Sequence, residues 1–552
     1  MSNQLDFTVG GLLDHIAGKY PDRDALIYHE RNLRYSWSQF NERCRQVAKG
    51  LLKLGVKKGD NLSIWAYNVP EWVTLQFATA KIGAILVTVN TSYKSAELEY
   101  ILGQSDSTTL FMVKSFKDSD YVATVNEVLP ELATSGACNL KSPKLPYLKN
   151  VIFIGDGAPA GMMNFEEIVK LGDGVSDAEL AAVEATLDRH EVINMQYTSG
   201  TTGFPKGVML THYNVVNNGF NIGECMKFTE QDRLCIPVPF FHCFGCVLGV
   251  MACVTHGTAM VPVEIFDPLK VLETIEKEKC TAVHGVPTMF IAELEHPDFD
   301  KFDLKTLRTG IMAGSNCPIE VMKKVISKMH ASEITIAYGQ TESSPVITQT
   351  RTDDAIELRV ATVGRSLPDV EVKIVDIETG EALPPGKQGE LCTRGYHVMK
   401  GYYKMPDETA KAIDQEKWLH TGDLAIMDEN GYCKITGRIK NMIIRGGENI
   451  YPREIEEFLY THPKVSDIQV YGVPDRKYGE QVMASIILKK GMAMTEEEVR
   501  EFCNGKIANY KIPKYVKFVD SYPMTASGKI QKFKMRDMAI KELSLEDAGP
   551  TA

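Results

Sequence analysis

Residues 36–90 read SWSQFNERCRQVAKGLLKLGVKKGDNLSIWAYNVPEWVTLQFATAKIGAILVTVN, and this stretch decides the fold class. Its first part has Ser36 and Gln39 at the spacing of a helix capping box, and Gly55 where that helix should stop. An apolar strand, a second helix beginning at Pro70 and another apolar strand follow in turn. Helices and strands that alternate in this way predict a layered α/β architecture with a mostly parallel sheet.

The length of the chain predicts more than one domain. Its 552 residues, of which 44% are hydrophobic and 24% charged, have the composition of a globular protein too large for one hydrophobic core. The composition shifts after GRIKNMIIRGGENIYP, beyond which helix and strand signals of a small α+β domain follow. We therefore predict a large N-terminal domain over residues 1–439 and a small C-terminal domain over residues 440–552.

The charge and the cysteines indicate the cellular setting. A formal net charge of −11 argues against a general affinity for nucleic acid or for an anionic membrane surface, since both reward a basic surface. The twelve cysteines are scattered, and the N-terminus has neither a basic leader nor an apolar signal region. These features predict a cytoplasmic protein without disulfides.

Residues 234–263 contain no Asp, Glu, Lys or Arg, which meets the length criterion for a membrane span. Prolines near both ends and several internal glycines divide this segment, so we expect a buried helix and a strand beside an apolar pocket instead. Cys243 and Cys246 form a CxxC within it, but no second CxxC accompanies them. Packing is a better interpretation of this pair than a zinc site.

The stretch YTSGTTGFPKG, residues 197–207, predicts a phosphate-binding loop. It lacks the GxxxxGK[ST] pattern of the common P-loop, yet it combines hydroxyls, glycines and one lysine. Hydroxyl groups can donate to phosphate oxygens, and glycines let the backbone N–H groups approach them closely. The candidate residues are Thr198, Ser199, Gly200, Thr201, Thr202, Gly203 and Lys206.

Three further motifs carry polar groups suited to a nucleotide. IAYGQTESSP ends a strand with Tyr338 and Gly339 and then presents Gln340, Thr341 and Glu342, as a nucleotide with hydrated magnesium would require. WLHTGDLA and GRIK supply Asp423 and Arg438, and we expect the carboxylate to be buried at a strand end, where it can bind a ribose diol. PMTASGKIQK contains Lys529, which on its own is typical of a solvated surface lysine.

These motifs in this order resemble the adenylate-forming superfamily of acyl-CoA synthetases, luciferases and peptide-synthetase adenylation domains. The resemblance covers essentially the whole chain, and the segment PFFHCFG is most similar to that of medium-chain acyl-CoA synthetases of the acyl-CoA synthetase family member two type. It implies two half-reactions: a carboxylate attacks the α-phosphorus of Mg-ATP to give acyl-AMP and pyrophosphate, and the thiol of coenzyme A then displaces AMP.

The resemblance also implies roles for particular residues. Residues 198–206 would hold the β- and γ-phosphates, Thr341 the α-phosphate and Glu342 the magnesium ion. Asp423 and Arg438 would bind the ribose, and Lys529 would stabilise the charge of the adenylation transition state. Lys440 would be the hinge of a mobile C-terminal domain. The adenine would lie among Ala313, Gly314, Ser315 and Tyr338, and the coenzyme A tunnel would be lined by Gly446 and Gly447.

For the acid, the family's pocket corresponds to His242, the helix through Gly245, Cys246 and Leu248, and Val286. The uncharged surroundings favour a hydrocarbon tail, whether a medium chain, a ring or an aryl group. His242 has two interpretations, a substrate contact or a packing residue. Transfer to a carrier protein, luciferase-type oxidation, a non-catalytic nucleotide-binding role and a homodimer remain open.

Overall fold

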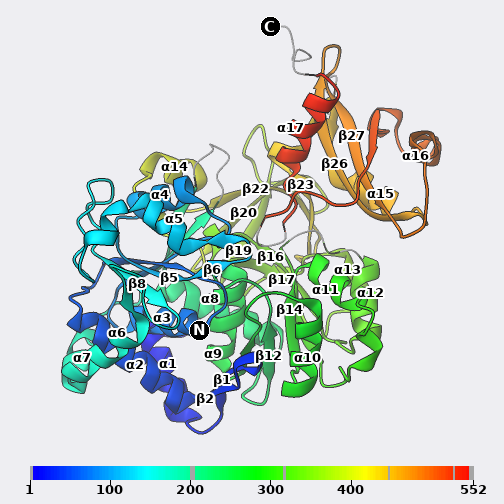
Figure 1. The fold of residues 1–552 in the computed structure, drawn as a ribbon. Helices are drawn as coiled ribbons and strands as arrows, with labels where there is room; N and C mark the ends of the chain where they lie inside the picture. Colours follow the sequence, from blue (N-terminus) through cyan, green and yellow to red (C-terminus); the bar gives the residue numbers. More distant parts are fainter. Residues whose placement is uncertain are drawn as a thin grey trace. The chain divides into compact units, whose positions relative to one another are not determined.

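The computed structural model describes residues 4–198, 205–314, 317, 319–445, 448–525 and 529–545. The chain divides into two compact units, the first formed by residues 1–372 and 393–419 and the second by residues 373–392 and 420–552. Figure 1 shows the elements in chain order. Lys440, the predicted boundary, lies inside the second unit.

One sheet of the first unit has eight strands, and its central pairs, from β10 to β9, are parallel. Only β11 and β21 at one edge are antiparallel to their neighbours. In spatial order the strands are β21 (Gly401–Tyr402), β11 (Lys206–Thr211), β10 (Val192–Thr198), β4 (Ile85–Thr88), β3 (Asn61–Trp65), β5 (Ser107–Val113), β8 (Asn150–Ile154) and β9 (Met163–Asn164).

A second sheet of this unit has nine strands and is parallel from β1 to β16, with antiparallel strands at both edges. The order is β18 (Arg365–Ser366), β17 (Val346–Gln349), β16 (Thr335–Gly339), β15 (Thr309–Met312), β14 (Ala282–Gly285), β12 (Arg233–Ile236), β13 (Ala259–Pro262), β1 (Asp24–Tyr28) and β2 (Leu33–Ser36). The predicted α/β class with a mostly parallel sheet is confirmed. A short ribbon, β6 (Ser115–Phe116) and β7 (Ser119–Asp120), stands apart.

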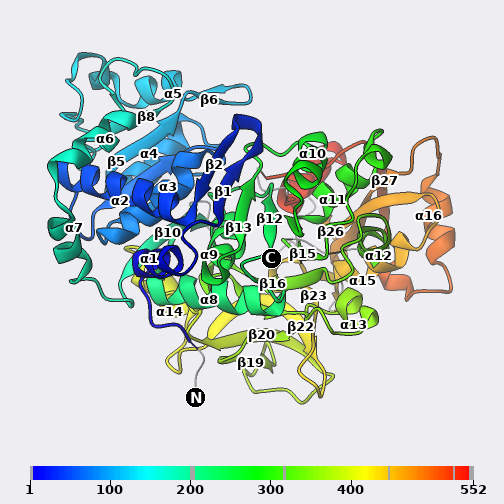
Figure 2. The same cartoon turned by 90° about the horizontal axis from the view of Figure 1, so that it is seen from below.

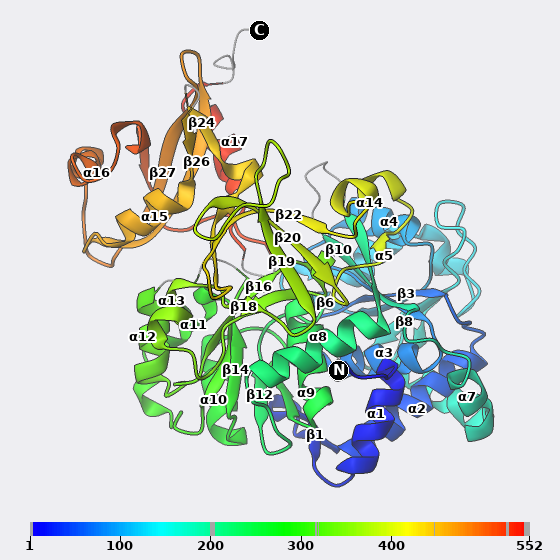
Figure 3. The same cartoon turned by 180° about the vertical axis from the view of Figure 1, so that it is seen from behind.

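Helices pack on these sheets as the sequence predicts. The helix expected after Ser36 spans Trp37–Lys53, its capping box is formed, and Gly55 follows its end in the left-handed region at φ 94°. Figure 2 shows α8 and α9 side by side, and Figure 3 shows α10 to α13 together beside the nine-stranded sheet. The helices of the first unit are α1 (Val9–Lys19), α2 (Trp37–Lys53), α3 (Pro70–Lys81), α4 (Ser95–Gln104), α5 (Tyr121–Val128), α6 (Phe165–Leu171), α7 (Asp177–Glu184), α8 (His212–Cys225), α9 (Ala252–His256), α10 (Pro268–Glu278), α11 (Pro287–Leu294), α12 (Ile319–Lys328), α13 (Ile356–Ala361) and α14 (Pro406–Ala412).

The charge-free segment 234–263 forms strands of the nine-stranded sheet and the helical turns between them. It comprises most of β12, a π-helix η4 (Phe244–Met251), the short helix α9 and the strand β13. In the parts of the chain that the structure describes, no helix is long and apolar enough to cross a membrane. The expected buried helix and strand are present, and the helix has π rather than α geometry.

The second unit contains most of a four-stranded sheet and a separate sheet built around the long hairpin β26–β27. Apolar side chains of α15, α16 and this hairpin form its own core. The elements are β19 (Val370–Val375), β20 (Gln388–Gly395), β22 (Leu419–Met427), β23 (Cys433–Arg438), β24 (Ile443–Arg445), β25 (Glu448–Ile450), β26 (Val465–Asp475), β27 (Gly479–Leu488), β28 (Tyr515–Phe518), α15 (Pro452–Tyr460), α16 (Glu496–Cys503) and α17 (Lys532–Glu542).

Candidate active site

The loop after β16 presents the predicted nucleotide-binding side chains. The strand ends at Gly339, and Thr341 then begins a single 3-10 turn that reaches Ser343. Gly339 is required here, because a Cβ at this position would lie 1.8 Å from the carbonyl oxygen of Pro345. The narrow return of the chain into β17 therefore positions Thr341, which is buried, and Glu342, which is half-buried.

Glu342 is connected to Lys206 through Tyr402, a residue that the sequence reasoning missed. The Tyr402 hydroxyl donates to Glu342 Oε1 at 2.9 Å. Lys206 Nζ lies 5.0 Å from the centre of the Tyr402 ring, within the range of a cation–π contact. Tyr402 thus joins the β11 end of the predicted phosphate loop to the predicted magnesium ligand.

Lys206 also forms an ion pair with Glu408 on α14. Hydrogen bonds from Lys206 and then from Lys411 lower the pKa of Glu408 to about 2, so this carboxylate is ionised at neutral pH. Burial, followed by the charge of Glu342, raises the pKa of Tyr402 and keeps its hydroxyl protonated as a donor. The ammonium predicted to bind phosphate is therefore already balanced by an anion.

The π-helix η4 brings the predicted acyl segment to the nucleotide loop. The Cys243 Sγ atom lies 3.6 Å from the Thr341 Oγ1 atom. Since Cys243 follows His242 directly, the segment assigned to the acid touches the residue assigned to the α-phosphate. A nucleotide can activate an acid only where the acid's carboxylate and the α-phosphate meet, and this contact brings the two predicted binding segments together.

Two side chains from other elements satisfy carbonyl groups of this helix. Gln76 on α3 donates from Nε2 to the Cys246 carbonyl at 3.0 Å. His284 on β14 accepts from the Ile311 N–H through Nδ1, which leaves Nε2 to donate to the Leu248 carbonyl at 3.1 Å. Burial lowers the pKa of His284 to about 4, and the ring is therefore neutral. Gln76 and His284 are positioning residues that no motif indicated.

His242 accepts a hydrogen bond from the Phe244 N–H at its Nδ1 atom, at 3.1 Å. A neutral imidazole that accepts at Nδ1 carries its proton on Nε2. His242 can therefore present an N–H donor from Nε2. This geometry is compatible with a substrate contact and with a packing role.

The predicted adenine wall and the acyl pocket also adjoin each other. Ala313 donates its N–H to the Gly285 carbonyl at 3.2 Å. At Gly314, where φ is +89°, a Cβ would lie 3.1 Å from Val286 Cγ1. Tyr338 is half-buried at the end of β16, and Gln340 follows it in the loop.

Within the second unit, Asp423 and Arg438 form a pair. They are opposite each other in the β22–β23 ladder, and Arg438 Nε donates to Asp423 Oδ1 at 2.9 Å. The Asp423 side chain is 5% exposed and that of Arg438 is 50% exposed. Asp423 is buried as expected, but it lies in the middle of β22 rather than at its end, because the strand continues to Met427.

Lys440 lies in a 3-10 turn after β23, where burial and then the charge of Arg438 lower its pKa. Lys529 makes two hydrogen bonds with Thr525: its N–H donates to Thr525 Oγ1 at 3.0 Å, and its carbonyl accepts from the Thr525 N–H at 2.7 Å. Other predicted site residues lie outside the described residues, namely Ser199, Gly200, Thr201, Thr202, Gly203, Ser315, Gly446 and Gly447.

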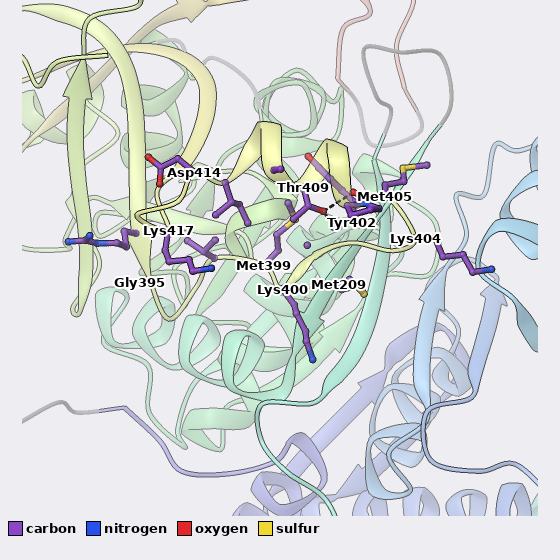
Figure 4. Close-up of a pocket in the computed structure, with 16 residues that line it drawn as sticks. Met209, Gly395, Met399, Lys400, Tyr402, Lys404, Met405, Thr409, Asp414 and Lys417 are labelled. Atoms are coloured by element: carbon purple, nitrogen blue, oxygen red, sulfur yellow. Dashed lines mark hydrogen bonds between the residues drawn. The ribbon is translucent and has the colours of Figure 1, made fainter. Parts of the chain in front are cut away.

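A cavity of about 770 Å³ opens beside β21 and α14. Figure 4 shows this region, where the Tyr402 N–H donates to Thr409 Oγ1 at 2.9 Å. The cavity shares Tyr402 with the site described above, but none of the predicted acyl-pocket residues lines it. The cavity therefore lies beside Tyr402 and the predicted phosphate-binding residues, and not at the predicted acyl pocket.

The fold and this site define an α/β enzyme in which the motifs predicted to bind a nucleotide lie against an apolar helix. The chain belongs to the AMP-binding enzyme family, whose model matches residues 13–403, while the model of the AMP-binding enzyme C-terminal domain matches residues 454–529. The resemblance predicted from the motifs is thereby confirmed.

Relatives match over the whole chain. YngI of Bacillus subtilis (strain 168), named as an acyl-CoA synthetase, is 60% identical and covers 99% of this chain and 100% of its own. The mitochondrial medium-chain acyl-CoA ligase ACSF2 of Bos taurus is 44% identical over 98% of this chain and 88% of its own. The crystal structure of the anthranilate CoA ligase AuaEII in complex with anthranoyl-AMP has a TM-score of 0.85 and is 27% identical, and the match covers 98% of this chain and 99% of that chain.

Proposed function

We propose that this chain is an AMP-forming ligase that joins an apolar carboxylic acid, with medium-chain fatty acids as the first candidates, to coenzyme A. The contact between Cys243 and Thr341 carries the proposal, because it brings the apolar helix η4 to the loop assigned to the α-phosphate. The medium-chain assignment is supported by the name of the ACSF2 relative and by the uncharged segment 234–263.

The reaction needs the acid's carboxylate and the α-phosphorus of ATP to meet away from water. The carboxylate is ionised near neutral pH, so no general base is needed for its attack. His242 can hold a carboxylate oxygen through its Nε2–H, while Thr341 can donate its hydroxyl to the α-phosphate. The acid–phosphorus bond forms as pyrophosphate leaves, and the coenzyme A thiol then displaces AMP from the mixed anhydride.

Magnesium fits the chemistry of Glu342, since hard divalent cations prefer carboxylate oxygens. The described contacts use one oxygen of this carboxylate, which accepts from Tyr402. A bound magnesium ion would neutralise phosphate charge. Tyr402 orients the carboxylate for that role and, being neutral, adds no negative charge of its own.

Lys206 would exchange its carboxylate partner for a phosphate. In the structure its ammonium pairs with Glu408, and Glu408 also pairs with Lys411 at 2.7 Å. When phosphate takes the ammonium of Lys206, Lys411 still balances Glu408. The exchange therefore leaves no carboxylate without a cation.

The remaining assignments concern the second unit. Asp423 and Arg438 would hold the ribose, and Lys529 would contribute its charge to the adenylation step. Lys440 as a hinge and a domain division at residues 439 and 440 stay predictions, as do a homodimer and a cytoplasmic location.

The proposed substrate class is tested by coenzyme A-dependent AMP release with acids from acetate to palmitate, benzoate and cyclohexanecarboxylate. Medium straight chains should give the highest kcat/KM. Truncation at Leu248→Ala should shift the optimum to longer chains, whereas Val254→Ala, an equally buried truncation on α9, should leave the optimum in place. Turnover confined to acetate or to aryl acids would contradict the medium-chain assignment.

A further inference from the structure

Three side chains of different chemistry meet on adjacent parts of the second unit. Glu390 and Cys392 come from β20, and His420 comes from β22. His420 Nδ1 lies 2.8 Å from Glu390 Oε2 and 3.4 Å from Cys392 Sγ. The three ligand atoms all lie within 4.8 Å of one another, and this is the one such group in the part of the chain that the structure describes.

Both contacts fall on the same ring nitrogen. The Nδ1 atom of His420 carries either one proton or one lone pair, so it cannot make two full hydrogen bonds, one to a carboxylate and one to a thiol. A cation placed between the three atoms would accept a lone pair from each of them at once. The arrangement therefore suits coordination better than a hydrogen-bonded pair.

The distances are close to those of a tetrahedral site. Zinc binds sulfur at about 2.3 Å and nitrogen or oxygen at about 2.0–2.2 Å, which separates neighbouring ligands by roughly 3.3–3.6 Å. The Cys392–His420 separation of 3.4 Å already fits. The Glu390 oxygen, at 2.8 Å, needs to move away by roughly half an ångström.

The surroundings hold these ligands in place. Gly422 donates its N–H to the other Glu390 oxygen, Oε1, at 2.9 Å, as carboxylate ligands of metals are commonly oriented by a second hydrogen bond. Cys392 is buried, while the His420 side chain is 34% exposed and that of Glu390 is 13% exposed. A cation can therefore enter from the histidine side, and water can take the fourth position.

We propose that Glu390, Cys392 and His420 form a binding site for a thiophilic divalent cation, with Zn²⁺ as the best match. A thiolate and an imidazole favour zinc over magnesium, so this site differs in kind from Glu342. Binding displaces the thiol proton of Cys392 to solvent as the sulfur–metal bond forms.

Occupancy has a consequence for the nucleotide, and this part rests on the proposed function. Asp423 donates its N–H to Thr421 Oγ1 at 3.1 Å, and Thr421 follows His420 directly. A cation that moves the Glu390 oxygen away from His420 changes the position of this part of β22. Zn²⁺ should therefore weaken ATP binding at Asp423 without competing for the phosphate loop.

The binding test uses the full-length protein, freed of metal by a chelator and titrated with Co²⁺ and then Zn²⁺. We expect one equivalent of Co²⁺ with a thiolate charge-transfer band that Zn²⁺ abolishes. The band should be absent in Cys392→Ser and in His420→Asn, and Glu390→Gln should weaken Co²⁺ binding at least tenfold. Cys433→Ser, which changes a buried cysteine of β23, should retain the band.

A wild-type protein without the band, or a band that persists in both Cys392→Ser and His420→Asn, would overturn the site. If Cys392→Ser does not fold, His420→Asn and Glu390→Gln still test the site, because both of these side chains are partly exposed and their replacement should disturb folding less. This readout does not depend on ligase activity. If the protein shows the cobalt band but does not catalyse the coenzyme A reaction, the proposed function is refuted and the metal site is not.

Discussion

Replacing Tyr402 by phenylalanine isolates the link between the predicted magnesium ligand and the phosphate loop. The change keeps the ring under Lys206 and removes only the hydroxyl that donates to Glu342 at 2.9 Å. A hydrogen bond to a charged group contributes about 1.5–3 kcal/mol. At about 1.4 kcal/mol for each factor of ten, the variant should lose roughly 10- to 150-fold in kcat/KM for Mg-ATP.

The assay is acid-dependent ATP–pyrophosphate exchange measured over a range of Mg²⁺ concentrations. The loss should shrink as Mg²⁺ rises, because excess cation compensates for a poorly oriented carboxylate. Tyr403→Phe is the matched control: its hydroxyl donates to Asp106 at 3.0 Å and does not reach Glu342. Equal effects of the two changes, or a loss that does not depend on Mg²⁺, would refute the role given to Tyr402.

Four other outcomes are expected. Lys529→Ala should abolish ATP–pyrophosphate exchange yet largely spare thioester formation from supplied acyl-AMP, and equal loss in both steps would contradict its assignment to adenylation. Asp423→Ala should weaken ATP binding by about 1.5–3 kcal/mol in calorimetry, and an unchanged affinity would remove this residue from the site. Lys81 is fully buried and donates to the partly exposed Asp14 at 2.7 Å, so Lys81→Ala should lower the free energy of unfolding by about 1.5–3 kcal/mol, and a urea midpoint near the wild-type value would contradict this. Burial lowers the pKa of His284 to about 4, so this residue should cost about 1.4 kcal/mol of stability per pH unit as the pH falls from about 6.5 towards 4, where only the unfolded chain takes up the proton. His284→Asn should reduce the slope of the stability–pH profile by that amount, and an unchanged slope would contradict this.

Much of the fold was predictable because its signals are local. The capping box at Ser36 and the left-handed Gly55 set the bounds of α2, and Pro70 sets the start of α3. The alternation of such helices with apolar strands is sufficient to predict a parallel sheet. The order of the strands in each sheet was not predictable, since it depends on pairings between residues far apart in the chain.

The arrangement of the candidate site was predictable where a motif presents its own side chains, as in the loop of Thr341 and Glu342. Tyr402 and Glu408 were missed because they reach Glu342 and Lys206 from a segment distant in sequence, and no periodicity marks them. The aromatic and acidic run GYYKMPDE was the available signal.

The π geometry of η4 also could not be predicted from the sequence. A π-helix is rare, and its carbonyl groups here take hydrogen bonds from Gln76 and His284 on other elements. The mid-strand position of Asp423 has a similar cause, because the pairing of β22 with β23 decides where the strand ends.

The central claim is that the acid is activated as an adenylate before coenzyme A reacts. Isotope exchange between pyrophosphate and ATP, measured without coenzyme A, tests it most directly. The account predicts exchange that requires both Mg²⁺ and an apolar acid, with AMP released in turnover only after coenzyme A is added. No exchange with any acid, together with AMP formation that needs all three substrates at once, would contradict it.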